Sequence, residues 1–147
     1  MTTAEHLDTI DRLRTRDFPD VRARSEVGTS GPGYHLAELG GSRWYGDEDA
    51  GGRVAQEEQV AAECEALAQR LAERWGDPDV FTLASLRLRV DGEDGEEVAE
   101  PWREIGDTTE CLHLWRAGGR WVAVYESRWG ADHSPQLMAA VTVIDPP

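Results

Sequence analysis

Cys111 and His113 are the two residues whose types and spacing most readily suggest a chemical site. One residue separates them in an alternating run, so their side chains share a face of the predicted strand. A thiolate and an imidazole are zinc ligands, and Cys64 or another histidine could complete a site. No CxxC, HxxxH or HExxH spacing occurs, and an unpaired cysteine is ordinarily a small core residue. We therefore expect no metal or cofactor, and two reduced, buried thiols.

His113 also suggests a second kind of site, in which it acts with a nearby acid such as Glu110. Trp115 shares its strand face, and a pocket between helix and sheet could bring the three together. This hypothesis describes a small-molecule-binding domain or a small enzyme. The chain has no lysine, which excludes Schiff-base, pyridoxal-phosphate and phosphate-loop lysine chemistry. Ser30 lacks a GxSxG context because Pro32 replaces the required glycine, so the sequence favours a protein without catalytic residues.

The six tryptophans and one acidic loop offer a third possibility, a recognition surface for a partner protein. Tryptophan is enriched at binding surfaces, although core packing is the alternative for most of the six. The loop 91–97 lacks the spacing of a calcium loop and is typical of a solvated hairpin tip. The predicted binding face combines Trp102, Trp129, Glu93, Asp94, Glu96 and Glu97.

The charge balance supports the recognition hypothesis. The chain has 29 acidic residues against 15 arginines, a net charge of -14, while residues 1–25 contain five of each sign. Such a field favours a basic protein partner and opposes nucleic acid and anionic membranes, although it also serves solubility alone. No apolar run is long enough for a signal peptide or a membrane span, so we expect a cytoplasmic protein. The leading functional hypothesis is a non-enzymatic acidic binding module, similar to an immunity or inhibitor protein.

These residues must be positioned by one domain, predicted to span residues 1–147. A short helix is expected near residues 3–15. Residues 17–52 are glycine-rich, and we expect them to be irregular or to form a short hairpin that turns at Gly40-Gly41. Within them, the segment 28–33 is typical of a flexible connection.

The longest predicted helix, 53–76, carries Val60, Cys64, Leu67, Leu71 and Trp75 on one face. Residues 79–144 form the predicted sheet, with a hairpin at Gly118-Gly119 and a central strand at 136–144. The fold class is α+β: one long amphipathic helix and a short N-terminal helix packed on a mostly antiparallel sheet of four to six strands.

Four segments carry a resemblance to known sequences. They are Leu71–Gly76 (LAERWG), Glu100–Trp102 (EPW), Leu114–Val122 (LWRAGGRWV) and Pro135–Val141 (PQLMAAV). The tryptophan, glycine and leucine positions in these segments resemble those of a group of small uncharacterised acidic actinobacterial proteins. The resemblance covers about residues 65–143. The absence of lysine and asparagine, both encoded by AT-rich codons, agrees with a GC-rich genome. The resemblance implies a shared fold and assigns no active residues.

Overall fold

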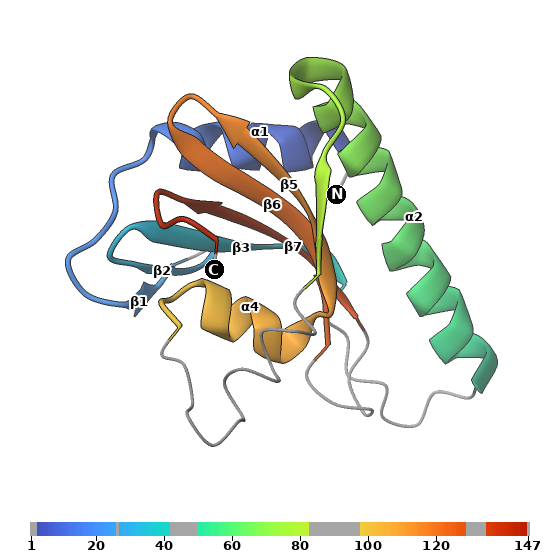
Figure 1. The fold of residues 1–147 in the computed structure, drawn as a ribbon. Helices are drawn as coiled ribbons and strands as arrows, with labels where there is room; N and C mark the ends of the chain where they lie inside the picture. Colours follow the sequence, from blue (N-terminus) through green and yellow to red (C-terminus); the bar gives the residue numbers. More distant parts are fainter. Residues whose placement is uncertain (1–2, 26, 42–49, 83–97, 129–134, 147) are drawn as a thin grey trace.

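The fold is a single antiparallel sheet with helices on both faces (Figure 1). The computed structural model describes residues 3–25, 27–41, 50–82, 98–128 and 135–146. Within these residues the sheet has seven strands, in the order β1-β2-β3-β7-β6-β5-β4. The strands are β1 (Ala23–Arg24), β2 (Gly28–Gly31), β3 (Tyr34–Gly41), β4 (Asp79–Thr82), β5 (Cys111–Ala117), β6 (Arg120–Ser127) and β7 (Gln136–Thr142). The α+β class is confirmed, whereas the predicted range of four to six strands is wrong.

The strands β1, β2 and β3 lie in the segment 17–52, which was expected to be glycine-rich, irregular or a short hairpin, with a flexible connection at 28–33. β2 pairs with β3 from Gly28 opposite Ala37 to Gly31 opposite Tyr34. A Cβ atom at Gly28 would lie 2.0 Å from the Leu36 carbonyl oxygen, so only glycine permits this approach. Gly40 and Gly41 lie inside β3 rather than in a turn, and residues 43–45, which would form the second strand of the predicted hairpin, lie outside the described residues. Close main-chain pairing with β3 thus makes a strand of a segment whose side chains show no alternating apolar pattern.

Among the described residues there are three helices, and two of them follow the sequence pattern. The helix α1 spans Thr3–Thr15 as expected, and α2 spans Ala50–Trp75, beginning three residues before the predicted start. Gly76 ends α2 with a positive φ of 87°, and its amide donates to the Ala72 carbonyl oxygen. The third helix, α4 (Trp102–Thr108), was not predicted, because seven residues are too few to show a helical period.

The helices divide the core between the two faces of the sheet. One cluster joins α1 and α2 to the sheet through residues such as Leu13, Leu67 and Val124. The other cluster lies on the opposite face, where Trp102 and Ile105 of α4 pack against it. Both faces of β7 are buried and β7 lies between β3 and β6, which confirms the predicted central strand. The β5–β6 hairpin turns at Gly118 and Gly119, also as predicted.

The segment after α1 is held against the sheet by Arg120 and His35. The Arg120 guanidinium donates to the carbonyl oxygens of Leu13 and Arg16, each at 2.8 Å, and lies over the Phe18 ring. The buried His35 ring stacks on Phe18 and contacts the Ser30 hydroxyl at 2.6 Å. These contacts satisfy carbonyls at the C-terminal end of α1.

Among the described residues, no helix is both long enough and apolar enough to cross a membrane.

Candidate functional site

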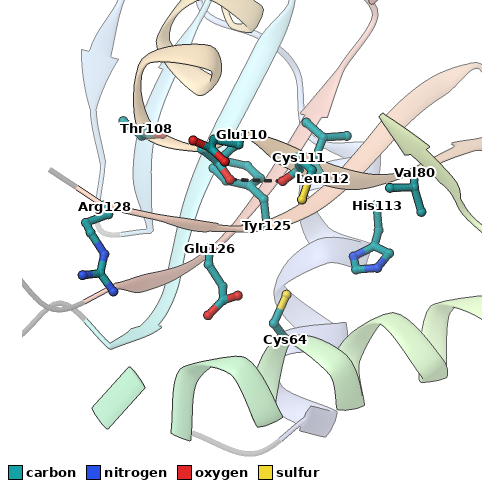
Figure 2. A pocket seen from close by; sticks show the side chains of 11 residues that line it. Cys64, Val80, Thr108, Glu110, Cys111, Leu112, His113, Tyr125, Glu126 and Arg128 are labelled. Carbon is teal, nitrogen blue, oxygen red and sulfur yellow. Dashed lines mark hydrogen bonds between the residues drawn. The ribbon is translucent and has the colours of Figure 1, made fainter. Parts of the chain in front are cut away.

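A hollow of about 630 Å³ opens between α2 and the ends of β5 and β6 (Figure 2). Strand β4 and the segment that follows α4 complete its wall. The described lining residues are Cys64, Val80, Thr108, Thr109, Glu110, Cys111, Leu112, His113, Tyr125, Glu126 and Arg128. Its position is set by the alternation of side chains along the two strands.

The strand face toward α2 changes from apolar to polar along its length. Nearer the hairpin turn, Trp115 and its cross-strand partner Val122 are part of the core beneath the helices. His113 pairs across the strands with Val124, and the same face then continues with Cys111 and Glu126. Core packing therefore ends where the polar side chains begin, and the hollow occupies the uncovered end of this face.

Glu126 is a half-buried carboxylate on β6, next to an arginine that is paired with another acid. Loss of solvation raises the pKa of Glu126, Arg128 lowers it and Glu57 raises it. The Arg128 guanidinium is itself committed to Glu57, with an Nη2 to Oε1 distance of 2.8 Å. Among the described residues no hydrogen bond or ion pair is formed by Glu126. A desolvated carboxylate without a donor favours a ligand that brings a proton donor or a positive charge.

Cys64 reaches the hollow from α2 and faces the strands, with Glu126 and His113 on either side in Figure 2. Burial, together with the nearby Glu126, Cys111 and Glu65, raises the pKa of the Cys64 thiol to about 12. The thiol is therefore protonated at neutral pH and is a poor nucleophile.

Both cysteines are free, but only one of them is buried as predicted. Cys64 is buried, whereas Cys111 is exposed at the start of β5, so the expectation of two buried thiols is wrong for Cys111. The described residues contain no group of three or more histidine, cysteine or acidic side chains arranged to hold a metal. What the arrangement offers is hydrogen-bond acceptors and negative charge beside an apolar wall.

The predicted pocket residues are only partly brought together. His113 and Glu110 both line the hollow. Trp115 is not among the described lining residues: it is 3% exposed, its indole N–H donates to the Gly76 carbonyl oxygen at 3.0 Å, and it packs edge-on against Trp75. The imidazole of His113 stacks against Trp115 with ring centroids 6.3 Å apart. Trp115 therefore supports His113 from the core side.

Trp102, the tryptophan of the predicted recognition face that lies among the described residues, is buried. Trp102 is 1% exposed, and its indole N–H donates to the Ile144 carbonyl oxygen at 3.0 Å. The ring is buried in the core between α4 and the sheet, so it offers no surface to a partner. The other members of that face, Trp129 and the four acids Glu93, Asp94, Glu96 and Glu97, lie outside the described residues.

Sequence reasoning did not single out Glu126 or Arg128. A usable signal was present, because Val122, Val124, Glu126 and Arg128 recur at every second position. Two charged residues that continue an apolar strand face indicate that the cover over that face ends there. Cys64 was considered only as a core residue or a metal ligand.

A smaller hollow of about 370 Å³ adjoins the first along α2. Cys64, His113 and Glu126 line both hollows. The remaining described lining residues of the smaller hollow are Ala61, Glu65, Ala68, Gln69, Ala72 and Pro78. The three shared side chains thus lie where the two spaces meet.

A comparison with known proteins finds no matching family, no matching curated protein and no matching solved structure. The fold and the site define an α+β protein with an open, acidic hollow at one end of its helix-covered sheet face.

Proposed function

We propose that this protein is a non-enzymatic binding module that engages a basic surface of a partner protein, in the manner of an immunity or inhibitor protein. The observation that carries the proposal is Glu126, a half-buried carboxylate that lines the hollow and forms no hydrogen bond or ion pair among the described residues. A surface carboxylate normally keeps its water. One that is partly desolvated in the free protein is suited to a partner that supplies a further positive charge.

The distribution of charge supports a cationic partner. The net charge is -14, and several arginines are already used in ion pairs within the chain. Examples are Arg22 with Glu104 at 3.0 Å and Arg128 with Glu57 at 2.8 Å. Because these arginines are paired with acids of the same chain, the excess acids determine the long-range electrostatic field. This field accelerates association with a basic protein, and salt weakens it.

The chemistry of the hollow also supports binding rather than covalent catalysis. Cys64 is the buried thiol of the hollow, and its high pKa keeps it protonated. The same negative field opposes the phosphates of nucleic acid and of anionic lipids, so we propose a cytoplasmic protein that binds neither.

The test is affinity capture from lysate of the source cells with three immobilised forms of the full chain. These are the wild type, Glu126→Gln and the control Glu73→Gln, which removes a charge from a 70% exposed side chain on α2. We expect the wild type and Glu73→Gln to enrich the same basic protein, and Glu126→Gln to lose most of it. Binding of that purified protein must then weaken with salt. A captured set identical for all three forms contradicts the proposal.

A second candidate function is a small-molecule site or a small enzyme that uses His113 with Glu110 or Glu126. The observation in its favour is that all three side chains line one hollow. A fragment screen followed by NMR would test it. A compound whose binding is lost in His113→Gln, and which competes with no protein partner, would favour this candidate over the first.

A further inference from the structure

We propose that the two adjoining hollows form one groove for an extended segment of the partner protein, and that an arginine or lysine side chain of this segment pairs with Glu126. This inference rests on the proposed function, because it names the part of the partner that the hollow receives.

The size and connection of the hollows indicate a segment rather than a single side chain. Volumes of about 630 Å³ and about 370 Å³ each fall in the range that accommodates drug-sized ligands. Cys64, His113 and Glu126 line both, so one occupant can contact all three while extending to either side. The larger hollow lies between α2 and the strands (Figure 2), and the smaller one is lined mainly by residues of α2.

The charges of the groove select a basic side chain. Carboxylates come from three separate elements: Glu126 from β6, Glu65 from α2 and Glu110 from the segment before β5. Arg128 is the only arginine or lysine among the described lining residues, and its charge is offset by Glu57. An anionic ligand would therefore meet net repulsion, whereas a guanidinium or ammonium group gains a charge-assisted hydrogen bond.

The apolar parts of the lining match the stem of such a side chain. Val80 is 68% exposed on β4, where its side chain faces the hollow, and Ala61 and Ala68 line the smaller space. Arginine and lysine bury their methylene groups against apolar surface while their charged ends reach a polar partner. His113 forms no hydrogen bond among the described residues, so its ring nitrogen is available as a second acceptor.

The experiment titrates the full chain with a capped Ala-Arg-Ala tripeptide and with the same tripeptide containing citrulline, the neutral isostere of arginine. Backbone amide shifts are followed by NMR at low salt. We expect the arginine peptide to shift the amides of Cys64, His113 and Glu126. We expect about tenfold weaker binding of the citrulline peptide, and of the arginine peptide to Glu126→Gln, as the loss of one partly desolvated charge pair predicts.

The control Glu73→Gln should bind the arginine peptide like the wild type. Equal affinity for both peptides, or shifts that map away from the groove, overturns the inference. The citrulline comparison uses the wild-type chain, so it is decisive even where a variant fails to fold.

The outcomes also separate this inference from the proposed function. Peptide binding that depends on Glu126, with no Glu126-dependent protein captured from lysate, supports the basic-group site and overturns the partner-protein proposal. Capture of a protein that depends on Glu126, without any peptide binding, supports the partner-protein proposal. It overturns the inference that a basic side chain pairs with Glu126.

Discussion

Trp102→Phe tests whether the tryptophan of α4 is a core residue rather than part of a recognition face. The substitution removes the indole hydrogen bond to the Ile144 carbonyl oxygen, which contributes about 1 kcal/mol. The smaller ring also leaves unfilled space at a side chain that is 1% exposed, which costs roughly another 1 kcal/mol. We therefore expect the free energy of unfolding to fall by about 2 kcal/mol, or about 7 °C in Tm for a chain of this length.

The matched control is Trp121→Phe, which removes the same kind of hydrogen bond at the surface. The Trp121 indole N–H donates to Asp145, whose side chain is 82% exposed, so water can replace the contact. We expect a loss below about 1 kcal/mol for this control, measured by urea unfolding beside Trp102→Phe. The reasoning is refuted by a Trp102→Phe protein that is as stable as the wild type but binds its partner less well.

Three further predictions concern charge. Glu126→Gln should leave the free energy of unfolding in urea unchanged or slightly higher, because it removes a carboxylate charge that is partly desolvated and still screened by solvent; a clear loss of stability would indicate that Glu126 holds the fold together. Burial lowers the pKa of His6 and of His35, so the unfolded chain binds more protons than the folded one as pH falls through about 6.5, and stability should decrease there. The raised pKa of Glu126 makes stability increase as pH falls, which opposes the effect of the histidines, so the pH series is best run in Glu126→Gln. A free energy of unfolding that stays constant from about pH 7.5 to about 5.5 contradicts the lowered histidine pKa values. Arg120→Gln removes two hydrogen bonds to the end of α1 and a cation–π contact, and should cost about 2 kcal/mol by thermal unfolding, with an unchanged Tm as the contrary result.

Elements with a strong local period were predictable from the sequence. The helix α2 shows apolar residues at helical spacing from Val60 to Trp75, and Gly76 marks its end. The strand β7 is apolar at successive positions, which is typical of a strand covered on both faces. His113 and Glu110 could be placed near each other because both belong to one short segment. In each case the information lies within a few residues along the chain.

Contacts between distant parts of the chain decided the rest. β2 has little side-chain signal and exists because its main chain pairs with β3. The sequence analysis placed Trp102 on the predicted binding face, whereas packing of α4 on the sheet buries it in the core. The hollow lies where α2 no longer packs closely on the strands. Because α2 crosses the sheet there, Cys64 of the helix and Glu126 of β6 line the same space. The residue types and their local periods can be read from the sequence, whereas burial, including the partial burial of the Glu126 carboxylate, arises only when remote elements pack together.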